Sequence, residues 1–317
     1  MAYAIGIDVG GTKIAYGLYG EGHTQAQART LALVHSLVEP ARPDLPAADM
    51  LDRMASSAER LMREGGVNKA KVRGVGAAFP SFIEFAKGKI IETANLPHFK
   101  NVAVRDELAA RLGLPVVIDN DANAAALAEN RLGAGKGFDQ MVYITVSTGI
   151  GTGLILNGEL YRGAHGWAGE LGHMLVNDSS PVLCGCGKRG CVEGSASGTG
   201  VARYVKARVA EGAPCSIIGE ITSISVERAA EEGDALAREA QAQAAVSLGK
   251  LFYNIYQSFD VDCIVYGGGA SKNKGLISGA IEWFEQASPR AREYPVTFLP
   301  ARFGADVGMV GAALLVV

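Results

Sequence analysis

The chain has 317 residues, too many for one small core, so we expect two domains. Hydrophobic residues make up 48% of it and charged residues 20%, which is typical of an ordinary globular protein. Its formal net charge of −3, with no basic block, argues against a nucleic-acid-binding protein, because phosphate binding depends largely on clustered Lys and Arg.

The N-terminus has no positively charged lead and no cleavage pattern, so we expect no signal peptide. The longest apolar runs are short and interrupted by Gly or Asp, and none is predicted to span a membrane. We therefore expect a cytoplasmic protein with no membrane partner. Because disulfides are disfavoured in that compartment, clustered cysteines among the five are expected to bind metal.

Predicted strands and helices alternate along the chain. In the first part, strands are expected over residues 3–9, 14–19, 29–36, 72–79 and 114–118, and helices over about 47–63 and 102–112. In the second part, strands are expected over residues 140–147, 152–156 and 262–266, and helices over about 121–132, 197–211, 224–232, 234–258, 273–287 and 305–316. This alternation predicts an α/β fold with a largely parallel sheet in each half.

Residues 3–19 and 140–156 share one pattern, in which a strand, a turn rich in Gly and Thr, and a second strand follow one another. We interpret the two segments as a weak internal duplication of two α/β halves. Two unrelated hairpins are the alternative. No long linker separates the halves, so a boundary between them is expected to be a hinge rather than a tether.

The first of these turns contains Asp8, Gly10, Gly11, Thr12 and Lys13. Its glycines leave room for backbone N–H groups to face a phosphate, Thr12 can donate its hydroxyl, and Lys13 supplies positive charge. Asp8, at a strand end, is suited to binding magnesium directly or through water. The spacing matches neither a Walker loop nor a dinucleotide fingerprint, and a hairpin turn that needs glycine is the alternative.

Two further glycine-rich segments follow predicted strands. Residues 147–153 combine three glycines with three hydroxyl residues and form a second candidate phosphate site. Gly267, Gly268 and Gly269 would let a flat ring or a ribose approach the backbone, although a plain turn is the alternative. Three such segments at the carboxyl ends of strands support one another, because ligands of α/β proteins gather there.

A polar run, Asp119-Asn120-Asp121-Ala122-Asn123, lies between a predicted buried strand and an apolar helix. Helix capping is one explanation, and Asn120 or Asp121 suits it. A cap needs one side chain rather than four, so the surplus indicates a ligand site. A carboxylate at this junction can accept a proton from a substrate hydroxyl, as phosphoryl transfer requires.

Four potential metal ligands lie within nineteen residues: His173, Cys184, Cys186 and Cys191. Three thiolates and one imidazole in a glycine-rich segment predict a closed tetrahedral zinc site, which is structural because no position is left open. Buried free thiols are the alternative. Glu170 and Glu193 bracket this segment, and two acceptors fixed by one ion suit the hydroxyls of a sugar. Two solvated surface acids are the alternative.

Together these segments resemble the ROK family of bacterial sugar kinases, within the actin/hexokinase/Hsp70-like superfamily, and are most similar to its glucokinase-like branch. The matching segments extend over nearly the whole chain: residues 8–13, 120–123, 147–153, 169–173, 184–193 and 267–269. The resemblance implies two actin-like (ribonuclease H-like) α/β domains with the active site in a cleft between them. The first would cover residues 1–119, with the last helix, 304–317, packing back onto it, and the second residues 120–303 with the zinc loop.

The resemblance also implies ATP-dependent phosphorylation of a hexose, in the first place of glucose to glucose 6-phosphate. Residues 8–13 would bind the ATP phosphates with Asp8 near Mg²⁺, Thr148 and Gly149 would face the phosphates from the second half, and residues 267–269 would flank adenosine. Asp121 would be the general base. Contacts with the sugar would come from these residues: Asn95, Asn120, Asp121, Glu170, His173 and Glu193. His173 would bind zinc through its other ring nitrogen.

One segment departs from the family pattern. The usual Gly-x-Pro-Gly-Pro loop, which lies near the sugar in relatives, is Ala78-Phe79-Pro80-Ser81-Phe82 here. The acceptor therefore stays open among glucose, N-acetylmannosamine, N-acetylglucosamine, fructose, allose and an aminosugar, and polyphosphate could replace ATP.

A sugar sensor without catalysis, binding sugar and a partner protein, is a further alternative. The intact Asp8, Asp121 and glycine segments argue against it. Repressors of the family carry an N-terminal DNA-binding domain, whereas this sequence begins with the phosphate strand, so nucleic acid is not an expected partner. A homodimer is expected from the resemblance.

Overall fold

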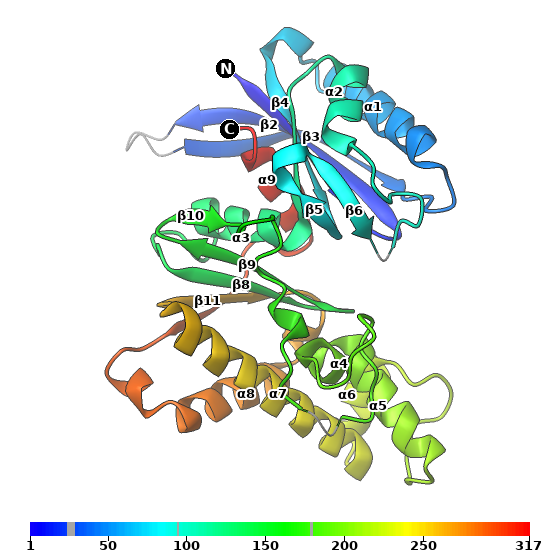
Figure 1. Ribbon diagram of the computed structural model, residues 1–317, viewed down its shortest axis with the longest axis vertical. Coiled ribbons are helices and arrows are strands. Elements are labelled where there is room, and N and C mark those ends of the chain that lie inside the picture. The colour runs from blue at the N-terminus through cyan, green and yellow to red at the C-terminus, as the bar shows by residue number, and fades with distance from the viewer. Residues whose placement is uncertain (24–28, 94, 178–179) are drawn as a thin grey trace.

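The computed structural model describes residues 1–23, 29–93, 95–177 and 180–317, which form two α/β halves stacked on one another (Figure 1). Each half is built on a five-stranded sheet. The strand order is β3-β2-β1-β4-β7 in the first sheet and β10-β9-β8-β11-β12 in the second. In these parts of the chain, no helix combines the length and the apolar character that crossing a membrane requires.

The two sheets have the same pattern of strand pairing. The first sheet consists of β1 (Tyr3–Val9), β2 (Lys13–His23), β3 (Arg29–Pro40), β4 (Val72–Phe79) and β7 (Val116–Asn120). The second consists of β8 (Met141–Val146), β9 (Ile150–Leu156), β10 (Glu159–Tyr161), β11 (Cys263–Gly267) and β12 (Thr297–Pro300). In each sheet, the first three strands of the sequence form antiparallel pairs. The fourth strand pairs in parallel with the first, and the fifth pairs in parallel with the fourth. The shared order and pairing support the predicted internal duplication.

Both sheets are mixed, so the expectation of largely parallel sheets is wrong. The reason lies in the tight turns between β1 and β2 and between β8 and β9. Strands joined by a short turn must run antiparallel, because a parallel neighbour needs a crossover of a dozen or more residues. The predicted α/β class is otherwise confirmed. The prediction omitted α4 (Val192–Ala196), β10, β12 and a small hairpin of β5 (Ser81–Glu84) and β6 (Lys89–Thr93).

Helix α1 (Ala47–Glu64) lies against the first sheet because its apolar residues recur at helical spacing. Met50, Leu51, Met54 and Leu61 are buried in one core with strand residues such as Ile7. Each such side chain stabilises the fold by about 1.5–3 kcal/mol relative to full exposure. Helix α2 (Val104–Leu112) adds Leu108 to the same core.

The second sheet is covered on its outer face by a group of helices (Figure 1). They are α4, α5 (Gly198–Ala210), α6 (Ser223–Glu231), α7 (Ala235–Phe259) and α8 (Lys274–Ala287). Their apolar residues and the strands share a separate core, which contains Ile144, Leu248 and Phe252. Each half therefore has a hydrophobic core of its own.

Two helices lie between the sheets and join the halves: α3 (Asp121–Leu132) and α9 (Val307–Leu314) (Figure 1). Helix α9 packs on β1 and β4, and helix α3 packs on β8 and β9. The two helices approach closely at Gly311, where an added Cβ would collide with the backbone of Ala124. The absence of a side chain at Gly311 thus sets the distance between α3 and α9.

We expect Gly311→Ala to lower the free energy of unfolding by about 1–3 kcal/mol, because the added methyl group overpacks the α3–α9 contact. Gly275→Ala is the matched control, since the nearest atom to its added Cβ lies 3.4 Å away in ordinary contact. A helical Gly→Ala change without a clash should stabilise by up to about 1 kcal/mol. Urea unfolding of both variants measures the difference, and equal effects would contradict the close approach.

Candidate active site

The start of helix α3 is fixed by Asn120. Its Oδ1 accepts hydrogen bonds from the backbone N–H groups of Ala122 at 2.8 Å and Asn123 at 3.3 Å, which makes Asn120 the N-cap. Its Nδ2 donates to the carbonyl oxygen of Ser81 on β5, 3.3 Å away. The capping explanation is therefore confirmed for Asn120, and it leaves the side chain of Asp121 for another role.

The carboxylate of Asp119 connects the two halves of the molecule. It is buried, and its Oδ1 accepts hydrogen bonds from the Asn120 N–H at 2.8 Å and from Nδ2 of Asn123 at 2.9 Å. Its Oδ2 accepts one from Nε of Arg162 at 2.8 Å. Arg162 follows β10 in the second half. No local sequence pattern predicts the role of Arg162, because its partner lies 43 positions earlier in the chain.

Asp121 has a carboxylate suited to accepting a proton. Burial raises its pKa, although the N–H of Ala122, which donates to Oδ1 at 2.9 Å, opposes the increase. Backbone N–H groups of Ala122 and of Asp121 itself donate to this carboxylate, and among the described residues no other residue donates to Oδ2. Oδ2 is therefore available to an incoming hydroxyl group.

Asp8 lies within electrostatic reach of Asp121. Burial raises the pKa of Asp8 from its ordinary 3.8 to about 6, the charge of Asp121 adds to the increase, and Lys13 opposes it. Helix α9 contributes to the burial, because Gly308 lies against the Asp8 carboxyl group where an added Cβ would collide. Two carboxylates thus lie near one another where the halves join, and Lys13 adds a positive charge near Asp8.

The turn between β1 and β2 presents the other residues predicted to bind phosphate. The N–H of Gly10 donates to the carbonyl oxygen of Lys13 at 2.9 Å and closes the turn. Thr12 and Lys13 are exposed, so their polar groups are accessible. An added Cβ on Gly11 would lie 3.3 Å from the Cβ of Asn95, which places Asn95 directly beside the turn.

The corresponding turn of the second half borders a cavity of about 470 Å³. The N–H of Ser147 donates to the carbonyl oxygen of Gly149 at 2.9 Å and closes this turn. Residues that line the cavity come from the turn, from α5 and α6 and from the third glycine segment: Ser147, Thr148, Gly198, Thr222, Ile224 and Gly269. Of the three predicted glycines, Gly269 lines the cavity, whereas Gly268 packs against Val146 and Gly267 against Tyr143. The cavity is in the size range of small-molecule sites.

The acidic residues around the metal segment converge on Asp121. Burial raises the pKa of Glu170, and the charges of Asp121 and Glu193 raise it further. His173 opposes this increase. Nε2 of His173 lies 3.9 Å from the Glu170 carboxylate. The carboxylate of Glu193 accepts a hydrogen bond from the N–H of Ile150 at 3.1 Å. The structure therefore brings three acids and one imidazole from distant segments into one region.

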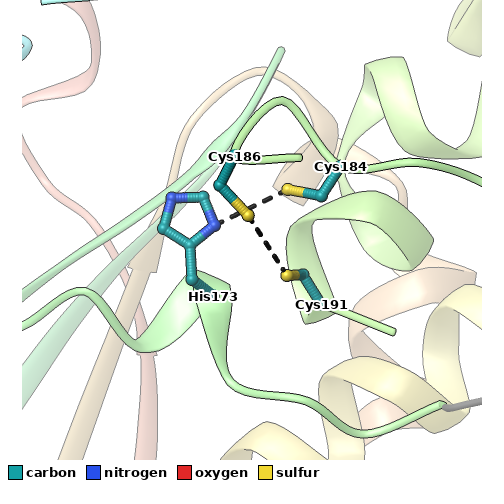
Figure 2. A group of neighbouring side chains, drawn as sticks. All are labelled: His173, Cys184, Cys186 and Cys191. Carbon is teal, nitrogen blue, oxygen red and sulfur yellow. Dashed lines mark hydrogen bonds between the residues drawn. The ribbon is translucent and has the colours of Figure 1, made fainter. Parts of the chain in front are cut away.

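Four residues of the predicted metal site face one another, as Figure 2 shows. They are His173, Cys184, Cys186 and Cys191, whose ligand atoms all lie within 4.8 Å of one another. Two pairs, Nδ1 of His173 with Sγ of Cys184 and the Sγ atoms of Cys186 and Cys191, are separated by 3.6 Å. Sulfur atoms around a tetrahedral zinc ion with bonds of about 2.3 Å are roughly 3.8 Å apart. The donor set and its spacing therefore fit zinc.

Comparison with known proteins gives a match over almost the entire chain. A sequence model of the ROK family matches residues 4–317. A glucokinase from Halalkalibacterium halodurans is 33% identical, over 98% of this chain and 94% of that protein. An N-acetylmannosamine kinase from Escherichia coli is 32% identical, over 98% of this chain and 97% of that protein.

Solved structures agree with the fold. A ROK hexokinase from Thermus thermophilus superposes with a TM-score of 0.83 and 34% identity, over 98% of this chain and 97% of that one. A ROK family glucokinase from Streptomyces griseus, in complex with glucose and AMPPNP, has a TM-score of 0.77 and 30% identity, over 99% of both chains. The chain is similar to both over essentially its full length.

The raised pKa of Asp8 predicts a pH-dependent loss of stability. An increase from 3.8 to about 6 corresponds to a penalty of about 3 kcal/mol for the charged carboxylate. The unfolded chain releases this proton near pH 4 and the folded chain near pH 6. The free energy of unfolding should therefore fall between these pH values and stay low above them.

Asp8→Asn should remove that fall and raise the free energy of unfolding at pH 7 by about 1–3 kcal/mol, measured by urea unfolding without divalent metal. Glu285→Gln, at an exposed position on α8, is the control and should leave the pH dependence of the parent protein unchanged. If Asp8→Asn has the same pH dependence of unfolding as the parent protein, the proposed cost of the charged Asp8 carboxylate is disproved.

Proposed function

We propose that this chain, which belongs to the ROK family and is a sugar kinase, phosphorylates glucose to glucose 6-phosphate with ATP as the donor. The convergence of Asp121 with Glu170, Glu193 and His173 carries this proposal, because it combines a proton acceptor with groups that suit sugar hydroxyls. The glucokinase relatives and the related structure with glucose and AMPPNP support the same reaction.

In this proposal Asp121 is the general base. Its raised pKa makes it a stronger proton acceptor than an ordinary aspartate, and its free Oδ2 can receive the proton of the acceptor hydroxyl. The oxygen of that hydroxyl then attacks the γ-phosphorus of ATP, and the bond to the leaving ADP oxygen breaks. The contacts of Asn120 and Asp119 fix the backbone on either side and so orient the carboxylate.

The donor nucleotide is proposed to bind along the two turns. Backbone N–H groups of residues 11–13 and 148–149, with the side chains of Thr12 and Lys13, would contact the phosphates. Adenosine would occupy the cavity beside Gly269, whose volume suits it. Asp8 would bind Mg²⁺, which supplies positive charge to the phosphates and would also relieve the penalty on this carboxylate.

The acceptor is proposed to bind through Asn95, Asn120, Glu170, His173 and Glu193. Zinc would be bound by Nδ1 of His173 and by the three thiolates of Cys184, Cys186 and Cys191, in a site with structural function. The ion would fix His173 directly and Glu193 through the adjoining loop. It would thereby orient two acceptor contacts at once.

A second candidate acceptor is N-acetylmannosamine, because kinases for this sugar are 32% identical to the chain. Activity towards other sugars, polyphosphate as donor, a homodimer, a cytoplasmic location and domain limits at residues 119 and 303 stay predictions. An assay that couples ADP release to a panel of sugars tests the reaction and the acceptor together. If none of the sugars in the panel causes ADP release, the kinase activity is refuted and a sugar sensor is favoured.

Asp121→Ala should lower kcat by about 10²- to 10⁴-fold, the usual contribution of a general base, while the sugar Kd changes little. The coupled ADP assay gives kcat, and calorimetry gives the Kd. Asp139→Ala, in the loop before β8, is the control and should have parental kinetics. Residual turnover within tenfold of the parent protein would rule out Asp121 as the base.

Removal of the proposed zinc should weaken the binding of sugar at the acceptor site. Cys186→Ser should lose the one bound zinc per chain, lower the Tm and raise the KM for sugar more than the KM for ATP. Cys215→Ser, which alters a cysteine outside the cluster, should keep its zinc and its kinetics. Metal analysis and thermal unfolding measure the outcome, and a parent protein without zinc at full activity would contradict the site.

A further inference from the structure

A short segment of the second half, residues 162–168, reaches across to the first half. Arg162 forms the ion pair with Asp119, and its guanidinium group lies 4.0 Å from the centre of the Phe85 ring. Gly166 lies so near to β5 that an added Cβ would be 2.7 Å from the carbonyl oxygen of Ile83. The segment is thus attached to the hairpin of β5 and β6 by charge, by an aromatic ring and by backbone contact.

The same segment brings two aromatic side chains together. The rings of Phe82, on β5, and Trp167 lie edge to face, with centres 6.0 Å apart and planes at 71°. Trp167 remains 47% exposed although it contacts another ring. A large apolar surface that is rigidly positioned but still open to solvent suits contact with a ligand better than it suits a core.

This aromatic pair stands next to the proposed acceptor contacts. Phe82 directly follows Ser81, whose carbonyl oxygen accepts the hydrogen bond from Asn120. Trp167 precedes Glu170 by three residues, and the intervening Gly169 is fixed by a hydrogen bond from the Thr152 hydroxyl to its carbonyl oxygen. Each ring therefore lies within three residues of a residue that is a proposed acceptor contact or is hydrogen-bonded to one, and the two rings contact each other.

A pyranose needs both kinds of surface. Its hydroxyl groups lie around the ring edge and require polar partners, whereas its axial C–H groups form an apolar face that packs on aromatic rings. We propose that Phe82 and Trp167 form an aromatic wall that contacts the C–H face of a hexopyranose acceptor and sets its affinity. This role rests on the proposed kinase function and assigns two specificity residues to the same site.

The test uses the position of the two tryptophans. Trp283 lies on α8, where it is half-buried and packs edge to face with Tyr253. Because the chain has two tryptophans, Trp283→Phe leaves Trp167 as the single one. Addition of glucose without ATP should change the fluorescence of this variant in a saturable way. Trp283→Phe itself should have the kinetics of the parent protein.

Trp167→Ala and Phe82→Ala should each raise the KM for sugar by about 3- to 10-fold, in the range of one aromatic contact, with kcat and the KM for ATP nearly unchanged. Trp167→Phe should restore most of the affinity. The double variant should be less impaired than the product of the single effects, because each ring positions the other. If the rings had a merely structural role, the alanine variants would have a lower Tm and a higher KM for both substrates, and Trp167→Phe would not restore the affinity.

The outcomes separate this inference from the kinase proposal. Phosphorylation of sugar with unchanged KM in both alanine variants, and no fluorescence response, would overturn the aromatic wall alone. A saturable fluorescence response without phosphorylation of any sugar would support the wall and refute the kinase. The absence of both a fluorescence response and phosphorylation would overturn both proposals.

Discussion

The buried carboxylate of Asp119 is the interaction on which the arrangement of the site depends. Removing a carboxylate from water costs several kcal/mol unless charge and hydrogen bonds compensate, and here Arg162 and two N–H donors on and next to helix α3 do so. Because Arg162 comes from the second half, the charge can be satisfied only when the two halves meet. The same contacts fix the start of α3, where Asn120 caps the helix and Asp121 is the first helical residue.

The internal duplication explains why each half has a turn of the same kind, which we propose binds phosphate. Each sheet begins with a hairpin whose turn is rich in Gly and Thr, and α3 and α9 are packed between the sheets. Close contact of these helices at Gly311 brings the Asp8 end of β1 near the start of α3. Small residues at the interface thus determine the separation of two carboxylates, and burial of both is the source of their raised pKa values.

Features encoded within a few neighbouring residues could be predicted from the sequence, whereas contacts between distant segments could not. The turn at Gly10 and the grouping of His173 with three cysteines depend on local spacing, and the structure has both. The pairing of Asp119 with Arg162 and of Phe82 with Trp167 depends on how the halves meet, which no local pattern records. The prediction of largely parallel sheets is wrong because it rests on the alternation of strands and helices, whereas the short turns after β1 and β8 require antiparallel pairs.

The geometry of His173 links the candidate metal site to the proposed acceptor site. Its Nδ1 faces the cysteines (Figure 2), and its Nε2 lies 3.9 Å from the Glu170 carboxylate. An imidazole bound to zinc through Nδ1, as we propose, carries its proton on Nε2 and can only donate there. Asp121, Glu170 and Glu193 are acceptors when ionised, and a sugar hydroxyl both donates and accepts. A metal that fixes one donor among three acceptors would therefore determine which hydroxyl oxygens the site can bind, and so the orientation in which the acceptor reaches Asp121.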